Sequence, residues 1–269
     1  MRREAFAKLN LALVVGERRD DGLHEVATVL QRIDLADTVE LDEGDELRVE
    51  GFEEDSLVRG ALELLARTVG LSARWRVRIE KRIPVAAGLG GGSADAAAAL
   101  ALANEALAEP LATARLERLA AELGADVPFF LATGPKLGEG AGERLRDVDI
   151  PHDYTVLVAL AAGAEKPSTA EVYRRFDATG GGPRFVERRA ALLAALERRD
   201  LAALPPNDLA DAAGGHDLVR ALRELGAFRA DVTGAGPAAY GLFEERDDAA
   251  RAAAALAGRG ALWLAKPVW

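Results

Sequence analysis

The stretch KRIPVAAGLGGGSADAAAALALANEAL, residues 81–107, decides the fold. It follows an alternating apolar segment, passes four glycines within residues 88–92 and enters a run of strong helix formers. This order predicts a strand, a glycine loop and a helix. The backbone N–H groups of such a loop, with the positive end of the helix dipole, form a phosphate site that needs no net positive charge. The alternative is a flexible connection with no ligand.

Two common nucleotide motifs do not describe this loop. No Gly-Lys-Ser/Thr closes it, so it is not a Walker loop, and no acidic strand end follows about 20 residues later, as a dinucleotide fingerprint requires. The loop is therefore a phosphate site of another kind or a flexible connection.

The composition narrows the class of protein. The chain has 269 residues with 49% hydrophobic content, enough for one large or two modest domains, and its formal net charge of −10 disfavours binding to nucleic acid or anionic membranes. It contains no cysteine, and its three histidines are far apart, so the sequence predicts no metal site of its own. No apolar run reaches the ~20 residues of a membrane span. The expected location is the cytoplasm.

The first strand carries two polar side chains on one face. Every odd position from Ala5 to Val15 is apolar, whereas Lys8 and Asn10 fall on even positions, about 7 Å apart in a strand. A lysine in this setting is usually solvent-facing. If its face is buried, the ammonium needs a partner such as Asp126 or a phosphate, because an unpaired buried charge is costly.

Asp126 lies between two predicted helices. The first, residues 113–123, begins with a capping-type Thr113, and Pro128 suits the first turn of the second. Asp126 is therefore well placed as a helix N-cap with no catalytic role. Equally, a carboxylate at a helix start near a phosphate loop could accept the proton of a substrate hydroxyl.

The pattern in the second half of the chain predicts an antiparallel sheet with two helices packed on it. Strands are expected at residues 154–160, 230–233, 238–243 and 261–266, with helices at 169–176, 183–196, 218–225 and 247–257. A charged segment at 144–153 suggests a domain boundary near residue 150. The predicted fold class is α+β with two domains, residues 1–150 and 151–269.

In order and spacing, five segments resemble the GHMP kinase superfamily. They are the strand around Lys8, the run from Arg18 to Glu25 with His24, the glycine loop, the segment Gly124–Phe130, and the pair Asn207–Asp208 with the turn 233–237. The likeness spans nearly the whole chain. The triple glycine, joined to the His24 and Gly-Ala-Asp-Val-Pro segments, is most similar to members that phosphorylate a cytidine diphosphate-linked methylerythritol.

This resemblance implies a fold, an activity and two catalytic residues. The N-terminal domain would resemble ribosomal-protein S5 domain 2, and the C-terminal domain would be ferredoxin-like. The activity would be ATP-dependent phosphorylation of a hydroxyl of a small molecule. Asp126 would accept the proton of that hydroxyl or orient it, and Lys8 would hold Asp126 and stabilise developing charge.

The resemblance also implies ligand contacts. Asn10 would bind the erythritol end, and His24 would read the cytosine edge. Mg²⁺ would bind together with ATP, and Ser93 would lie near this ion. The predicted substrate-binding residues are Asn10, His24, Tyr173, Thr233 and Gly234. The predicted ATP-binding residues are Pro84, Val85, Ala86, Ala87, Gly88, Leu89, Gly90, Gly91, Gly92, Ser93 and Ala94.

Two departures from the superfamily pattern bear on the substrate. Members usually have a second serine after Ser93 and an aromatic residue before the histidine, where this chain has Ala94 and Leu23. Tyr173 would then supply the remaining stacking face for cytosine, unless it only packs within its helix. The alternatives are a kinase of the homoserine or mevalonate type and an inactive nucleotide-binding relative. The expected partner is the small-molecule substrate, with the chain a monomer or a homodimer.

Overall fold

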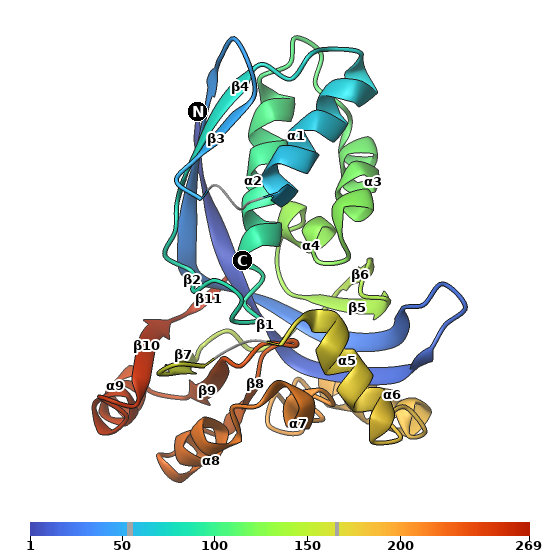
Figure 1. The fold of residues 1–269 in the computed structure, drawn as a ribbon. Helices are drawn as coiled ribbons and strands as arrows, with labels where there is room; N and C mark the ends of the chain where they lie inside the picture. Colours follow the sequence, from blue (N-terminus) through green and yellow to red (C-terminus); the bar gives the residue numbers. More distant parts are fainter. Residues whose placement is uncertain (53–55, 165–166) are drawn as a thin grey trace. The chain divides into compact units, whose positions relative to one another are not determined.

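The chain folds into two compact units that each draw on several parts of the sequence. The computed structural model describes residues 1–52, 56–164 and 167–269 (Figure 1). The first unit comprises residues 1–7, 35–85 and 90–133, and the second comprises residues 8–34, 86–89 and 134–269. Strands β1 (Arg2–Arg18) and β2 (His24–Glu43) contribute residues to both.

The sheet of the first unit uses the second half of β2. This half pairs antiparallel with β4 (Trp75–Glu80), which pairs parallel with β3 (Arg48–Glu50). In β4 the apolar residues are buried and the charged residues between them are exposed, because successive side chains of a strand point to opposite faces. One face of the sheet is thus left to pack on helices.

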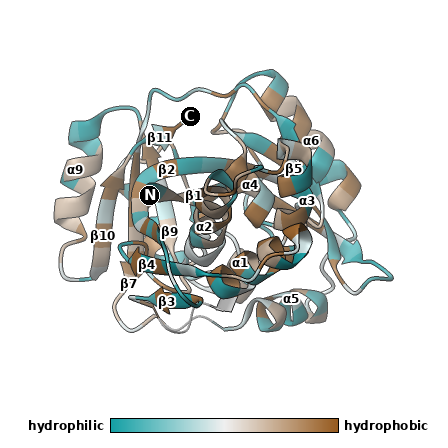
Figure 2. Ribbon diagram, turned by 90° about the horizontal axis from the view of Figure 1, so that it is seen from above, coloured by the Kyte–Doolittle hydropathy of each residue, from teal (hydrophilic) through white to brown (hydrophobic). Residues whose placement is uncertain are grey.

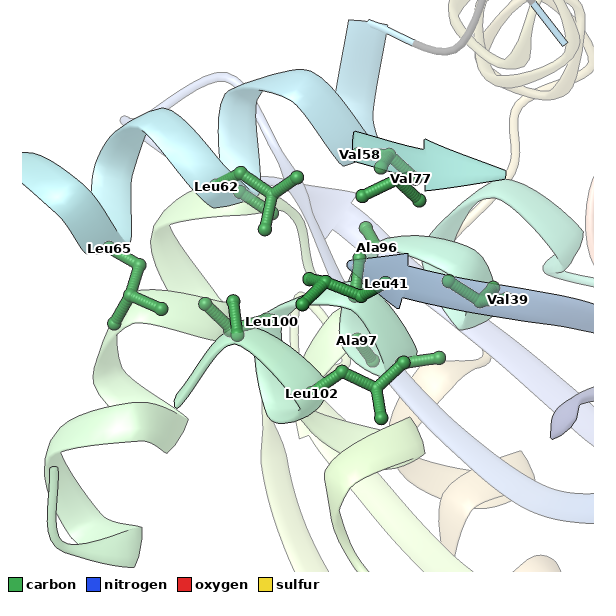
Figure 3. Close-up of a cluster of buried hydrophobic side chains, with 14 of the residues drawn as sticks. Val39, Leu41, Val58, Leu62, Leu65, Val77, Ala96, Ala97, Leu100 and Leu102 are labelled. Atoms are coloured by element: carbon green, nitrogen blue, oxygen red, sulfur yellow. The ribbon is translucent and has the colours of Figure 1, made fainter. Parts of the chain in front are cut away.

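Four helices complete the first unit (Figure 1). They are α1 (Ser56–Val69), α2 (Gly91–Glu105), α3 (Thr113–Leu123) and α4 (Val127–Leu131). Of these, α1 and α2 lie against that face of the sheet, and the other two pack on these helices. Along α1 and α3 the colouring alternates between hydrophilic and hydrophobic, as expected for helices with one buried face (Figure 2). Helix α2 is buried from Ala94 to Asn104, and its many alanines allow close packing. Figure 3 shows Leu62, Leu100 and Leu41 meeting in this core.

The second unit contains a four-stranded antiparallel sheet. Its order is β10 (Gly260–Ala265), β7 (Thr155–Ala161), β9 (Ala239–Phe243) and β8 (Arg229–Val232). Buried residues of α8 (His216–Glu224) and α9 (Arg246–Ala255) pack against it in one hydrophobic core. The predicted arrangement of two helices on an antiparallel sheet is confirmed, and the fold is α+β.

The remaining elements of the second unit surround the first half of β2. Strand β5 (Lys136–Gly140) pairs with it and with β6 (Arg144–Asp147), and β11 (Pro267–Val268) pairs with β2 at residues 32–33. The helices are α5 (Thr169–Ala178), α6 (Phe185–Glu197) and α7 (Ala210–Ala213). Residues of α5 and α7 share a core with Leu13, Val15 and Val26.

Several details differ from the expectations. The predicted cap Thr113 is the first helical residue of α3, and Ala112 holds the N-cap position. Residues 24–43 form one continuous strand of 20 residues. Strands β3, β5, β6 and β11 and helix α7 were not predicted. The compact units are not consecutive along the chain, and the domain boundary near residue 150 stays a prediction.

Candidate active site

The glycine loop is built from residues with left-handed backbone conformations. Ala86, Gly88 and Gly90 have φ values of 57°, 89° and 72°. Gly90 is the N-cap of α2, and no side chain of the described residues makes a capping hydrogen bond there. The N–H groups that open a helix have no partner within it, and donors of this kind are chemically suited to an anion.

The first half of the loop lies against the turn at residues 233–237 in the second unit. A Cβ on Gly88 would lie 2.2 Å from the carbonyl oxygen of Thr233, and a Cβ on Gly236 would lie 2.2 Å from that of Ala87. The backbone N–H of Ala238 also donates to the Ala87 carbonyl oxygen, at 3.2 Å. Both glycines are therefore required by the close approach of two backbones.

Lys8 and Asn10 meet the same turn. The Lys8 backbone N–H donates to the Leu89 carbonyl oxygen at 2.9 Å, and its ammonium Nζ donates to Asn10 Oδ1 at 2.5 Å. The Asn10 backbone N–H donates to Thr233 Oγ1 at 3.1 Å. Lys8 and Asn10 are each only 4% exposed. The expectation that such a lysine is usually solvent-facing is wrong here, because its strand is enclosed on both faces.

Gly234 completes this cluster. Its φ of +59° is left-handed, and a Cβ at this position would lie 3.2 Å from Asn10 Oδ1 and 3.3 Å from Lys8 Nζ. The amide of Asn207 donates to the Gly234 carbonyl oxygen at 2.8 Å and to that of Val232 at 3.2 Å. The turn thus brings Thr233 and Gly234 to the side chains of the first strand.

Asp126 occupies the N-cap position of α4 in the first unit. Its backbone is helical, with φ −83° and ψ −19°, and its side chain makes no capping hydrogen bond to that helix. Pro128 lies in the first turn, as predicted. The capping role that the sequence left open is therefore not what holds this carboxylate.

The first unit fixes the entry to the glycine loop through an ionic cluster that the sequence did not reveal. Asp37 accepts hydrogen bonds from the backbone N–H groups of Arg82 and Ile83, at 2.5 and 2.8 Å. Lys81 Nζ donates to Asp37 Oδ2 at 2.5 Å and to Asp95 Oδ2 at 2.6 Å. Burial lowers the pKa of Lys81, but the hydrogen bonds to these two carboxylates outweigh it, so the net pKa is raised.

His24 and Tyr173 lie side by side in the second unit. Their rings stack with centroids 4.8 Å apart and an interplanar angle of 29°. His24 is 7% exposed, and its Nε2 lies 2.8 Å from Asp177 Oδ1. Asp177 was not predicted, since 153 residues separate it from His24 and a lone aspartate near a helix end is common.

The chain matches the GHMP kinase family models. The model described as the GHMP kinases N-terminal domain matches residues 56–134, and that described as GHMP kinases C terminal matches residues 216–262. A 4-diphosphocytidyl-2-C-methyl-D-erythritol kinase from Nocardia farcinica is 41% identical over 95% of this chain and 89% of its own length. One from Caldanaerobacter subterraneus is 34% identical over 94% of this chain and 91% of its own length. The chain belongs to the 4-diphosphocytidyl-2-C-methyl-D-erythritol kinase family of GHMP kinases.

Solved structures agree with this family assignment. A crystal structure of 4-(cytidine 5'-diphospho)-2C-methyl-D-erythritol kinase is 35% identical, covers both chains completely and has a TM-score of 0.84. A mevalonate kinase from Methanococcus jannaschii, 14% identical with a TM-score of 0.76 over 100% of this chain and 98% of its own, shares the fold. As a GHMP kinase, the chain is an ATP-dependent small-molecule kinase, and the two-domain GHMP kinase fold is confirmed.

Among the described residues, neither a cluster of metal-binding side chains nor a membrane-spanning helix is present. No group of three or more histidine, aspartate or glutamate side chains among them could hold a metal ion. No helix among them is long and apolar enough to span a bilayer.

Proposed function

We propose that this chain transfers the γ-phosphoryl group of ATP to the 2-hydroxyl of 4-diphosphocytidyl-2-C-methyl-D-erythritol. One observation carries the chemistry: the backbone of Lys8 is hydrogen-bonded to Leu89 of the glycine loop, at 2.9 Å. The buried Lys8 ammonium lies near Gly234, whose turn packs on Ala87 and Gly88 of this loop, and left-handed loop residues are suited to bind phosphate. The substrate is the one named for relatives that match this chain over more than nine-tenths of its length.

Lys8 and Asp126 are the proposed catalytic residues. Phosphoryl transfer depends mainly on alignment and on stabilising the charge that develops on the transferred group. Asp126 would accept the proton of the attacking hydroxyl or orient it, and Lys8 would stabilise charge and hold Asp126. The burial of Lys8 at 4% exposure supports this role, because it strengthens the electrostatic effect of the ammonium. The pairing of the two side chains is a prediction.

Residues 84–94 are proposed to bind ATP. The left-handed backbone of Ala86, Gly88 and Gly90 supports phosphate binding through N–H groups. A Cβ on Gly92 would meet nothing within 4 Å, so the helix start leaves room at that residue for a ligand. Ser93 and Ala94 lie in the first turn of α2, where the helix dipole favours negative charge.

Mg²⁺ is proposed to enter with the triphosphate. This ion usually keeps several waters and binds largely through the oxygens of substrate phosphates, so a triphosphate could bring it with few protein ligands. Ser93 is the candidate hydroxyl near it. When bound, Mg²⁺ would neutralise charge on the phosphates. The chain's own contribution is to hold the phosphates through the loop.

The proposed substrate contacts lie in the second unit. Asn10, Thr233 and Gly234 would bind the erythritol end, supported by their joint hydrogen bonding beside Lys8. His24 would form hydrogen bonds with the edge of cytosine, and Tyr173 would stack on the cytosine ring. Leu23, in place of an aromatic residue, is 52% exposed and would offer apolar contact without stacking. A cytoplasmic location and the oligomeric state stay predictions.

The test is the release of ADP with a panel of alcohols. We expect turnover with 4-diphosphocytidyl-2-C-methyl-D-erythritol, ATP and Mg²⁺, and none above background with homoserine or mevalonate. Activity with either of these alcohols but not with the cytidyl substrate would overturn the proposed substrate. No ADP release with any of them, together with normal ATP binding, would favour an inactive nucleotide-binding relative.

A further inference from the structure

One face of α5 surrounds His24. Helix α5 starts after Ser168, whose Oγ accepts a hydrogen bond from the Glu171 N–H at 3.1 Å. Tyr173, Phe176 and Asp177 are spaced i, i+3 and i+4, so they share one side of this helix. Tyr173 stacks on His24, and the Phe176 ring meets it edge-on with centroids 6.2 Å apart. The two aromatic rings fix the plane of the imidazole.

Asp177 fixes which imidazole nitrogen carries the proton. Its Oδ1 lies 2.8 Å from His24 Nε2. An ionised carboxylate only accepts hydrogen bonds, so Nε2 must be the protonated nitrogen in this contact. In the neutral ring, Nδ1 is then an acceptor.

We propose that Asp177 is a positioning residue that makes His24 selective for cytosine over uracil. Cytosine carries an exocyclic amine, a donor, at the position where uracil carries a carbonyl oxygen, an acceptor. A His24 ring whose Nδ1 accepts a hydrogen bond can pair with the amine of cytosine. It cannot pair with the carbonyl oxygen of uracil, because both atoms are acceptors. This inference rests on the proposed function, in which His24 faces the base. It adds the residue that sets the hydrogen-bonding pattern of that histidine.

The contact is suited to this role. His24 is nearly buried, with 6% of its side chain exposed, whereas 44% of the Asp177 side chain is exposed. The carboxylate therefore keeps water contact, so its burial cost is small, and the ring is held by packing on α5. An exposed ion pair alone would contribute little stability, but a hydrogen bond to an enclosed ring determines the orientation and tautomer of that ring.

The experiment compares CDP with UDP as probes of binding by the full chain. We expect the wild-type protein to bind CDP more tightly than UDP. In Asp177→Asn the side-chain amide can donate to Nε2, which moves the imidazole proton to Nδ1. The preference for CDP should then fall about tenfold or more, as expected when a specific hydrogen bond is replaced by a mismatch. KM for the cytidyl substrate should rise more than kcat falls.

Two further variants separate positioning from simple loss of structure. Glu171→Gln lies on the same helix but pairs with Arg174 and Arg175 in a solvent-exposed cluster, so it should keep the CDP preference. Asp177→Ala removes the acceptor without supplying a donor, and should give an intermediate preference. An unchanged preference in both Asp177 variants would overturn the proposal.

A spectroscopic measurement tests the tautomer without any substrate. Nitrogen-15 NMR of the imidazole rings, with His24 assigned by its loss in His24→Gln, should show protonated Nε2 in the wild-type protein and a shift toward protonated Nδ1 in Asp177→Asn. Protonated Nδ1 in the neutral wild-type ring would overturn the proposal. If the tautomers behave as expected but the wild-type protein has no preference for CDP, the proposed substrate fails and the selectivity role fails with it.

Discussion

At the scale of single residues, Gly234 is confined by two buried polar side chains of the first strand. The side chains of Lys8 and Asn10 both lie within 3.3 Å of the position that a Cβ would take. Cβ contacts this short require the neighbour to move, and both neighbours are buried and hydrogen-bonded to each other. The glycine therefore sets where the lysine ammonium can lie.

Gly234→Ala should lower turnover about tenfold or more, because a small displacement of a catalytic group is costly to the reaction rate. The control is Gly226→Ala, which also has a left-handed φ, +96°, but whose Cβ would meet nothing within 4 Å. Each substitution costs roughly 1–2 kcal/mol in backbone strain. Steady-state kinetics and thermal unfolding of both variants would check this. Equal turnover in the two variants would contradict the displacement of Lys8.

The Asp126→Asn variant should still bind ATP, but its turnover number should fall at least ~10²-fold, which is the usual size of general acid–base effects. The substitution preserves shape and removes the charge and the proton acceptor. The matched control is Asp217→Asn, whose side chain is 78% exposed and pairs with Arg220 on the surface. Titration with ATP and single-turnover kinetics measure the two effects separately. Near-normal turnover in Asp126→Asn would refute the role given to this carboxylate.

At the scale of elements, the ionic cluster of Lys81 joins β2, the end of β4 and the start of α2. The side chains of Asp37 and Asp95 are both 0% exposed, and both accept hydrogen bonds from Lys81. Asp37 also holds two backbone N–H groups just before the glycine loop. Removal of the ammonium would leave two buried carboxylates without this partner.

Lys81→Met should destabilise the fold by about 3–5 kcal/mol at neutral pH, as when one member of a buried ion pair is removed. The pKa of Lys81 is raised above 10.5 in the folded state, so its contribution is complete below pH 10.5 and is lost as the pH rises through the folded pKa. Urea unfolding across this range would show the wild-type advantage shrinking in alkali. Lys266→Met, at an exposed residue, should change stability little. An advantage that grew with pH would contradict the assigned sign.

The sequence predicted elements whose pattern is local and missed those that depend on distant partners. The alternation in β1 and the strand, loop and helix around residues 81–107 were predicted and are confirmed. Strand β2 continues through the polar residues near Asp37, where Lys81 and two backbone N–H groups satisfy the carboxylate. Strand β5 contains two glycines and reads as a loop until its pairing with β2 is known.

For the candidate site, the sequence predicted how side chains are arranged along one strand, but not what surrounds them. Lys8 and Asn10 were expected on one face of a strand, and their hydrogen bond agrees with this. The burial of Lys8 could not be predicted, since it depends on a turn more than 200 residues away, as the Asn10–Thr233 contact shows. The Asp177 contact is similarly non-local.

At the scale of the whole molecule, the two compact units share strands. Strand β1 passes from the first unit to the second between Ala7 and Lys8, and β2 passes back between Asp34 and Leu35. Because neither unit holds a complete β1 or β2, loss of one unit removes part of the sheet that supports the other. Unfolding should therefore be cooperative over the chain.

Scanning calorimetry should show a single unfolding transition. Leu100→Ala in the core of the first unit and Leu222→Ala in that of the second should each destabilise by about 2–5 kcal/mol and lower the same transition. Val186→Ala, at a side chain that is 81% exposed, should leave it nearly unchanged. Two transitions, each lowered by only one of the core variants, would contradict this cooperativity.

The spacing of Tyr173, Phe176 and Asp177 on α5 restricts how the gene can change over evolution. One codon inserted between positions 173 and 177 would rotate the later residues by about 100° about the helix axis, and the carboxylate would leave the imidazole. The Gly180–Gly182 segment lies after the helix, so a change in its length leaves the angular positions of these three residues unchanged. Insertions and deletions in orthologues should therefore occur mainly in the segment that follows α5 and only rarely within the helix.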